Sequence, residues 1–372
     1  MAPIKTILHI TPFFRPNIGG AETHLEDLTS ELEKRNYNQV VLTYSPLSTK
    51  TSYNKIEVTD HLYIRRFYLP GHNLFHILEK YPLVNFLYIT PYLLLRSFVW
   101  LLVNRPHIDT IHSHGLNSAL IGNILKKVFN IKRHITSIYS TYDNVPLNSF
   151  STNLLVNILN STDCVLTQSN QSVKQLTSLG VFKKNIFRYY HWIDLYRFKP
   201  TKKTSSNFSV LFIGRLIPPK NALTLALLAP KFPKITFNFI GTGPQYNSLR
   251  QLSLKHSNIK LIGDVPYRSL PQYYQQSTIF CLPSIYQEGW GRVLAESVAC
   301  GTPVICSNLG GTTEAVDKTI ALIVPPTSEN LENAIKKLYK NPSILKKLKS
   351  NCLSYAKKHY SSDNILFIAK HY

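Results

Sequence analysis

Short apolar runs alternate with amphipathic stretches along almost the whole chain. Most apolar runs have the length of a strand, and in the stretches between them apolar residues recur every three or four positions. Strands that alternate with helices form a parallel sheet with helices on both faces. The pattern therefore predicts an α/β protein.

The strands predicted in the first half are residues 6–11, 39–44, 62–67, 110–114, 134–139 and 164–168. The helices predicted there are residues 21–35, 117–129, 153–160 and 172–179. In the second half the predicted strands are residues 208–213, 236–240, 259–262, 279–283, 303–306 and 321–324, and two lysine-rich helices span 328–339 and 343–359.

The alternation is interrupted near residues 199–207, where the sequence is polar and has no periodicity. A chain of 372 residues has room for about two domains. We therefore expect one domain over residues 1–200 and a second over 201–360. A short amphipathic segment, 361–372, is expected to form a terminal helix that packs back towards the first domain.

Residues 82–103 form an apolar stretch that approaches the length of a membrane span. Pro91 and Arg96 lie inside it, and a central arginine is costly in hydrocarbon. The first interpretation is a helix packed in the N-terminal domain. The second is a helix that lies in a membrane interface, where Tyr88, Tyr92 and Trp100 would fit well.

The chain is strongly basic, with 42 Lys and Arg against 20 Asp and Glu, a net charge of +22 and a pI of about 9.7. Such a charge favours polyanionic partners: nucleic acid, an anionic membrane surface or a phosphorylated substrate. The five cysteines show no CxxC pairing, and the first residues lack the pattern of a signal peptide. We expect buried reduced thiols in a cytoplasmic protein without structural zinc.

Two carboxylates, Glu288 and Glu296, stand eight residues apart around Gly289, Trp290 and Gly291. The segment follows a predicted strand and opens a predicted helix. Ionised carboxylates accept hydrogen bonds from hydroxyl groups, while glycine amides at a helix start approach an anion closely. Together they favour a sugar nucleotide as the ligand.

Glycines and cations follow several other predicted strands. Gly19 and Gly20 lie between the first strand and its helix, which is typical of close approach to a phosphate or of a simple tight turn. Gly214 and Arg215 precede Lys220 on a proline-stiffened loop, where two cations can bracket a diphosphate or be solvated loop charges.

Further loops carry weaker signals. Gly243 belongs to a Gly-Thr-Gly turn after a strand, and Gly310 begins a second glycine pair that could pass a phosphate. His114 ends a strand, and His112 points to the same face, but no third ligand stands at a useful spacing for a metal. All these loops follow the carboxyl ends of strands, where α/β sheets bind ligands.

This ordered set of motifs resembles glycosyltransferase family four, the retaining sugar-nucleotide transferases. The resemblance is carried by the E-x7-E segment, Gly214-Arg215 with Lys220, Gly19-Gly20, Gly241-Thr-Gly243-Pro, and Gly263-Asp-Val265-Pro. It implies the GT-B architecture, which is two facing Rossmann-like domains, with the acceptor on the first domain and the donor on the second.

The resemblance also implies roles. Arg215 and Lys220 would neutralise the diphosphate leaving group, Glu288 with the amides of residues 289–291 would hold the transferred sugar, and Glu296 would hold the ribose. Three further residues would contact the donor: Val265 beside the base, Gly20 at the diphosphate and His114 near the anomeric centre. No metal and no cofactor beyond the donor are implied.

Two positions depart from the family pattern. The usual Gly-Phe-Gly is Gly-Trp-Gly around Trp290, which predicts a sugar subsite of different shape. The usual Asn-Gly-Val-Asp reads His191-Trp192-Ile193-Asp194, so the turn between the domains loses its glycine.

The sequence thus predicts a retaining transferase that moves a hexose-type sugar to a glycan or lipid-linked acceptor, in polysaccharide or cell-envelope glycan synthesis. We expect it in the cytoplasm, with peripheral contact to an anionic membrane and no specific nucleic acid. Acceptor recognition is expected in the loops 45–56 and 139–150. The alternatives are a nucleic-acid binder that uses the basic surface, and a sugar-nucleotide epimerase of the same architecture.

Overall fold

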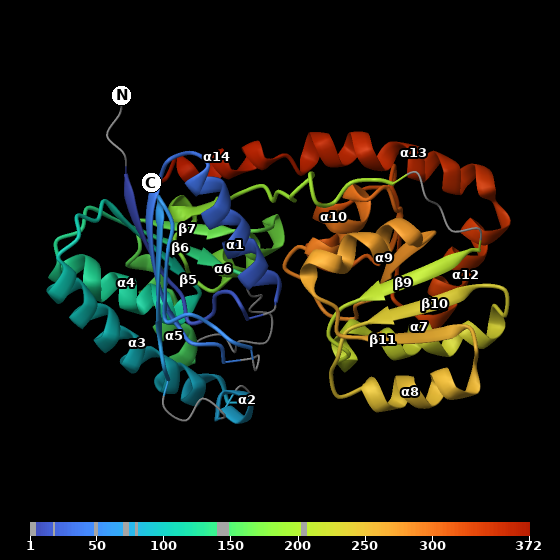
Figure 1. Ribbon diagram of the computed structural model, residues 1–372, viewed down its shortest axis with the longest axis horizontal. Helices are drawn as coiled ribbons and strands as arrows, with labels where there is room; N and C mark the ends of the chain where they lie inside the picture. The colour runs from blue at the N-terminus through green and yellow to red at the C-terminus, as the bar shows by residue number, and fades with distance from the viewer. Residues whose placement is uncertain are drawn as a thin grey trace. The chain divides into compact units, whose positions relative to one another are not determined.

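The computed structural model describes residues 5–17, 19–47, 51–69, 74–78, 81–139, 149–201 and 207–372. The chain divides into two compact units, residues 1–190 with 364–372 and residues 191–363 (Figure 1). Each unit is built on a sheet covered by helices, which confirms the predicted α/β class. Much of the loop 139–150 and of the predicted boundary 199–207, together with part of the loop 45–56, lies outside the described residues.

The first unit contains a sheet of eight strands in the order β3-β4-β2-β1-β5-β6-β7-β8. All pairings are parallel except that of the edge strand β3 with β4. The strands are β1 (Thr6–Ile10), β2 (Asn38–Tyr44), β3 (Ile56–Val58), β4 (Leu62–Phe67), β5 (Thr110–His114), β6 (Arg133–Ile138), β7 (Cys164–Thr167) and β8 (Ile186–Arg188). The short strands β3 and β8 were not predicted, because three residues carry too little pattern to be recognised.

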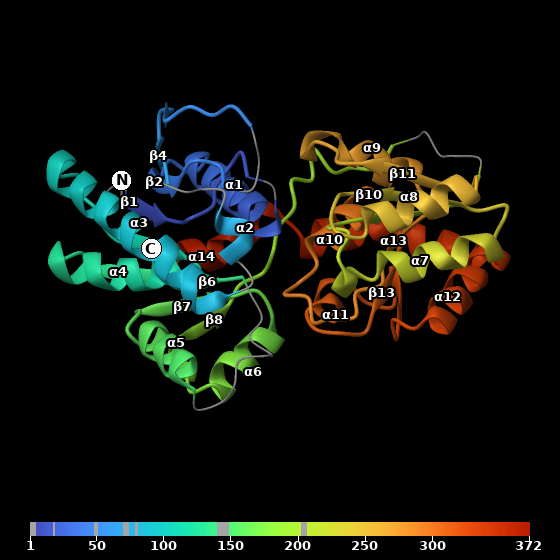
Figure 2. The ribbon, with the colours of Figure 1, turned by 90° about the horizontal axis from the view of Figure 1, so that it is seen from below.

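Helices between successive strands, and one helix from the end of the chain, complete this unit. They are α1 (Gly20–Glu33), α2 (Phe75–Leu78), α3 (Pro82–Asn104), α4 (Leu116–Val128), α5 (Phe150–Asn160), α6 (Asn170–Ser178) and, from the end of the chain, α14 (Leu366–Ala369). Helices α3 and α4 lie side by side in both views (Figures 1 and 2). The apolar stretch 82–103 is thus a helix, and one face of it enters the core of this unit through Ile89, Leu93 and Leu101.

The second unit contains an all-parallel sheet of six strands in the order β11-β10-β9-β12-β13-β14. The strands are β9 (Ser209–Ile213), β10 (Thr236–Ile240), β11 (Ile259–Gly263), β12 (Ile279–Leu282), β13 (Val304–Ser307) and β14 (Ala321–Val324). The helices are α7 (Ala222–Leu228), α8 (Tyr246–Lys255), α9 (Leu270–Gln276), α10 (Arg292–Ala299), α11 (Thr312–Ala315), α12 (Ser328–Lys340) and α13 (Pro342–His359).

Chain order reverses at one point in each sheet. In the first sheet β1 lies between β2 and β5, and in the second β9 lies between β10 and β12. In α/β sheets, ligands bind at such a reversal, outside the carboxyl ends of the strands. The candidate residues on the loops after β1, β5, β9 and β12 lie at these two reversals.

The first unit ends at residue 190, whereas the sequence placed the boundary at 200. The intervening residues pack on the second unit: Ile193 and Phe198 are buried in its core, and the Ile193 amide donates to the Tyr360 carbonyl oxygen over 3.1 Å. The polar stretch near residue 200 indicates only where the chain is solvated. The units divide earlier, because the side chains just before that stretch are already buried in the second unit.

Candidate active site

The Glu288 carboxylate accepts hydrogen bonds from three side chains of the second unit. It lies in the loop between β12 and α10 and is buried. Its Oε1 accepts from Ser284 Oγ and from Lys220 Nζ, both over 2.6 Å, and its Oε2 accepts from the Tyr286 hydroxyl over 2.9 Å. Because the carboxylate is held from three sides, its orientation is fixed before any ligand arrives.

Lys220 and Arg215 come from the loop after β9, the strand beside β12. Lys220 ends a 3₁₀ turn, Pro218–Lys220, and its ammonium also lies over the Tyr286 ring, 5.2 Å from the centroid. Arg215 is exposed, and in the described part of the chain its guanidinium has no hydrogen-bond or ion-pair partner. The loop thus presents one fixed cation and one that can bind an anion from solvent.

The environment keeps Lys220 charged. Burial by itself would lower the pKa of the lysine, but the Glu288 carboxylate and the Tyr286 hydroxyl outweigh it, and the net effect is a raised pKa. A permanently charged ammonium beside a fixed carboxylate suits a ligand that carries both phosphate and hydroxyl groups.

Glu296 lies on α10, after Glu288 in the chain, and is also buried. Its Oε1 accepts from Arg292 Nε and the Tyr267 hydroxyl, each over 3.1 Å, and its Oε2 accepts from Tyr274 over 2.9 Å. Burial raises the pKa of Glu296, and Arg292 and the two tyrosines oppose this effect. A ribose would have to join or replace these donors, so the proposed ribose contact requires them to rearrange.

The glycine turns of this unit bring loops together. The amide of Gly311 donates to the Glu288 carbonyl oxygen over 2.8 Å, and a Cβ atom on Gly311 would lie 2.0 Å from the Gly289 oxygen. Likewise, a Cβ atom on Gly243 would lie 2.6 Å from the Leu216 oxygen. These glycines therefore let neighbouring loops pack on the candidate site, an explanation that requires no phosphate.

The remaining donor-site candidates of this unit surround the same loops. Gly291 begins α10 in the left-handed region at φ 83°, and Gly214 follows β9 directly. Val265, after β11, is half-buried and packs against the core cluster that contains Trp290. Trp290 itself is buried, so its ring lies within the core and its backbone alone remains for a ligand.

His114 ends β5 in the first unit and is buried in a histidine-rich cluster. Its Nδ1 lies 2.7 Å from the Tyr139 hydroxyl, and its Nε2 lies 3.1 Å from Nδ1 of His9. Burial first, and then the neighbouring His112 and His9, hold the pKa of His114 well below its usual range. His114 is therefore neutral near pH 7. Because both of its ring nitrogens already have partners, the contact with a sugar hydroxyl that the sequence predicted requires one of these hydrogen bonds to be replaced.

The expectation that His112 and His114 have no third histidine is wrong. His9 stands opposite His112 in the register of β1 and β5, and ligand atoms of the three lie within 4.8 Å of one another. Both nitrogens of His112 already have partners, the Tyr372 hydroxyl and Ser137 Oγ, each at 2.7 Å. A metal ion would have to break such hydrogen bonds, so the three rings are explained as a hydrogen-bonded cluster.

Gly19 and Gly20 lie at the start of α1, after β1. A Cβ atom on Gly19 would lie 2.2 Å from Glu22 Oε2, whereas one on Gly20 would meet nothing within 4 Å. The open space beside Gly20 is where the sequence predicted a phosphate.

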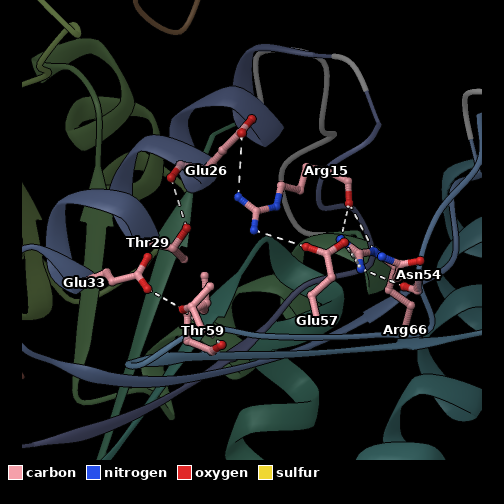
Figure 3. Close-up of polar contacts among 9 residues, drawn as sticks. Arg15, Glu26, Thr29, Glu33, Asn54, Glu57, Thr59 and Arg66 are labelled. Atoms are coloured by element: carbon pink, nitrogen blue, oxygen red, sulfur yellow. Dashed lines mark hydrogen bonds and ion pairs between the residues drawn. The ribbon is translucent and has the colours of Figure 1, made fainter.

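A buried arginine fixes the loop that leads to these glycines (Figure 3). Arg66, on β4, donates to the Arg15 carbonyl oxygen through Nε at 3.2 Å and Nη2 at 2.8 Å. Its Nη1 also pairs with Glu57 at 2.8 Å, and Glu57 pairs with the Arg15 guanidinium at 3.2 Å. Burial lowers the pKa of Arg66, and Glu57 offsets only part of this effect.

The sequence did not point to several of these residues. The sequence indicated Ser284 only as part of the segment ahead of the motif, and it did not indicate Tyr286; their hydroxyl groups, four and two residues before Glu288, were the available signal. Arg66 could have been noticed as an arginine within an apolar strand. His9 could not have been identified, because its contact with His114 depends on the order of the strands in the sheet.

Two family models match the chain in succession. Residues 18–197 match the model described as Glycosyltransferase Family 4, and residues 194–359 match the model described as Glycosyl transferases group 1. The chain is 26% identical over 370 residues to the uncharacterized glycosyltransferase MJ1178 of Methanocaldococcus jannaschii, covering 96% of this chain and 95% of that protein. It is 22% identical over 339 residues to the gpi3 subunit of the phosphatidylinositol N-acetylglucosaminyltransferase of Schizosaccharomyces pombe, covering 88% and 71%.

Solved structures share the fold. Sucrose-phosphate synthase from Thermosynechococcus elongatus matches with a TM-score of 0.80 at 20% identity, covering 98% of each chain. HepE of Anabaena, solved with UDP-glucose, matches with a TM-score of 0.78 at 17% identity, again covering 98% of each chain. Both comparisons establish the architecture of two Rossmann-like domains that the motifs predicted.

Proposed function

Because the chain belongs to glycosyltransferase family 4, we propose that it is a retaining transferase that moves a hexose-type sugar from a nucleoside-diphosphate sugar to a glycan or lipid-linked acceptor. One observation carries the proposal. The ion pair of Lys220 and Glu288 joins residues 68 positions apart in the chain, at the point where the order of the second sheet reverses. It brings a cation that would bind phosphate and a carboxylate that would bind hydroxyl groups together where α/β sheets bind ligands.

The chemistry required is the departure of a nucleoside diphosphate. Negative charge grows on the leaving phosphate, and fixed positive charge in a partly dry site stabilises it more than water does. Lys220 would supply the fixed charge, and Arg215 would close on the diphosphate as a planar fork. These cations perform the task that a metal ion performs in other transferases, so we propose that the reaction needs neither metal nor cofactor.

The sugar would be held by Glu288 and the backbone amides of residues 289–291. Glu288 already accepts three hydrogen bonds, so it is better suited to hold hydroxyl groups than to attack the anomeric carbon as a nucleophile. His114 would add a neutral hydrogen-bonding group, and Gly20 would give the diphosphate room. Retention would then follow from attack on the same face that the diphosphate leaves.

Relatives support the donor class. HepE was solved with UDP and with UDP-glucose, which makes uridine diphosphate sugars the first donors to try. Similarity to a teichuronic acid glycosyltransferase of Bacillus subtilis, TuaC, and to the phosphatidylinositol enzyme supports a polysaccharide or lipid-linked acceptor. We place the protein in the cytoplasm, where its five free, buried cysteines would stay reduced.

The test is thermal stabilisation by a panel of nucleoside diphosphates and sugar nucleotides, since a ligand of the folded state raises its melting temperature. We expect one base to stabilise selectively, and Arg215→Ala with Lys220→Ala to abolish the shift. Transfer assays with that donor, with and without EDTA, then report the metal requirement and the anomeric configuration of the product.

The same assays address the alternatives. An epimerase would convert the donor with no acceptor present, and a nucleic-acid binder would show steeply salt-dependent binding to arbitrary DNA or RNA. Failure of every nucleotide to stabilise the folded protein would overturn the proposed function.

A further inference from the structure

The outward face of α3 is apolar along the whole helix. It consists of Val84, Leu87, Leu95, Val99 and Leu102, which are 43 to 61% exposed and recur at helical spacing. An ordinary surface helix places charged and polar residues on this side. Here solvent meets a continuous apolar stripe, which is typical of a surface that contacts another molecule or a lipid.

The opposite face fixes how the helix can be used. Among the described residues α3 alone is long and apolar enough to cross a membrane, with a mean hydropathy of 1.7 over its most apolar window and 28% of that window buried. Ile89, Leu93 and Leu101 nevertheless lie in the core of the first unit. A helix tied to the core by one face can lie along a surface but cannot leave it to span a bilayer.

Positively charged side chains lie near one end of the apolar stripe. Within α3 the single charged side chain is Arg96, and its guanidinium lies over the Phe67 ring, 5.0 Å from the centroid. Beyond the carboxyl end three cations are exposed: Arg105, Lys127 and Lys132. Contact between the rings of Phe98 and Phe129, with centroids 5.5 Å apart, joins the ends of α3 and α4 and so brings these cations beside the stripe.

We propose that the outward face of α3 docks along the surface of an anionic lipid bilayer, with Arg105, Lys127 and Lys132 on the lipid headgroups. An apolar helix face flanked by cations binds such interfaces through both apolar burial and attraction to anionic lipid. A second copy of the chain is a poorer occupant, because it would bring the same net charge of +22 against the first.

The position of α3 connects this surface to the site. Asn117, three residues after His114, donates to Thr90 Oγ1 over 2.8 Å and lies 3.4 Å from the Phe86 carbonyl oxygen. The amino-terminal half of α3 is therefore beside the start of α4, which follows directly after His114 at the end of β5. This inference rests on the proposed function and deepens it: a lipid-linked acceptor held in the bilayer would have its head group delivered to the first unit.

The test uses flotation of the full chain with vesicles of phosphatidylcholine, alone or mixed with phosphatidylglycerol. We expect binding to the anionic vesicles, and about a tenfold or greater fall in the partition coefficient when Leu87, Leu95 and Leu102 are all changed to Gln. Leu227→Gln with Leu254→Gln and Leu353→Gln removes three exposed leucines from the second unit and is the matched control.

A second pair of variants tests the charges. Arg105→Gln with Lys127→Gln and Lys132→Gln is expected to weaken binding roughly fivefold for each cation that reaches the surface. The control removes the same charge elsewhere, with Lys336→Gln, Lys347→Gln and Lys357→Gln.

Two results would overturn the inference. One is equal vesicle binding by the α3 leucine variant and its control. The other is a wild-type dimer, seen by sedimentation without lipid, that this variant dissociates, since the stripe would then bind a second copy. Donor-induced thermal stabilisation is measured on the same variants, so that a failure of the docking surface with an intact donor shift leaves the proposed transferase standing.

Discussion

The ring of His191 stacks on the ring of Trp290, with centroids 3.9 Å apart and an interplanar angle of 15°. The two residues belong to the two segments in which the sequence departs from its family pattern, and both are buried. Tyr360 contacts the indole edge-on at 5.6 Å. The departures are therefore one packing unit. The predicted change in the shape of the sugar subsite does not follow from a tryptophan ring that lies in the core.

A double-mutant cycle tests this pairing. We expect Trp290→Phe and His191→Asn each to lower the free energy of unfolding by about 1 kcal/mol, and the double variant to lose less than the sum by about 0.5–1.5 kcal/mol, because the stacking is lost only once. Urea unfolding measures the three values. Strictly additive losses would show that the two rings do not stabilise one another.

The ion pair of Lys220 and Glu288 gives a second prediction. Lys220→Ala removes the fixed cation of the proposed phosphate site, so we expect kcat/KM to fall about 10²- to 10³-fold. We also expect weaker binding of the nucleoside diphosphate that the thermal panel selects. Activity assays and calorimetric titration measure the two effects.

Lys231→Ala is the matched control for that variant. Lys231 also pairs with a glutamate, Glu332, but the lysine side chain is 56% exposed. An exposed pair contributes little to stability, and this one lies on no predicted site loop. Full activity in Lys220→Ala would remove the lysine from the mechanism.

Gly20→Ala separates a binding role from a folding role. The new methyl group meets no protein atom within 4 Å, and alanine favours a helix start at least as well as glycine, so stability is expected to stay the same or rise by up to about 1 kcal/mol. If the diphosphate occupies the open space, donor affinity falls. In Gly19→Ala the new methyl group would meet only the flexible carboxylate end of Glu22, which can turn aside, so we expect the melting temperature to change little. Unchanged donor affinity in Gly20→Ala would place the phosphate elsewhere.

Local features of the sequence predicted local structure well. Strand runs and glycine loops are short-range signals, so the six strands of the second unit and the segment from Glu288 to Glu296 could be identified from the chain alone. The order of strands is not local, and contacts that depend on it were missed. His9 lies 105 residues from His114, and Tyr372 lies 260 residues from His112. His9 meets His114 only after β1 and β5 are placed side by side, and Tyr372 meets His112 only after the end of the chain has returned to the first unit.

It was harder still to predict from the sequence which side of a helix is exposed to solvent. Two interpretations of residues 82–103 were open from the sequence, a packed helix and an interfacial helix, and the structure shows why both had support. One side of α3 is core, and the other is exposed and apolar. Hydropathy alone sums the two sides, so it could not separate them.

Because several histidines are buried in the first unit, we expect acid to lower its free energy of unfolding. Burial lowers the pKa of His134 to about 3 from a usual value of 6.5, and that of His9 to about 3 as well. The folded state keeps both rings neutral, whereas the unfolded chain binds protons below pH 6.5. Their contribution to stability is therefore complete above pH 6.5, and each loses about 1.4 kcal/mol per pH unit as the pH falls from 6.5 towards 3.

Between pH 7 and pH 5, we expect the free energy of unfolding of His134→Gln to fall by about 2 kcal/mol less than that of the wild type. The slope of urea-derived stability against pH gives the measurement. An unchanged slope in His134→Gln would mean that this histidine is not held neutral by the fold.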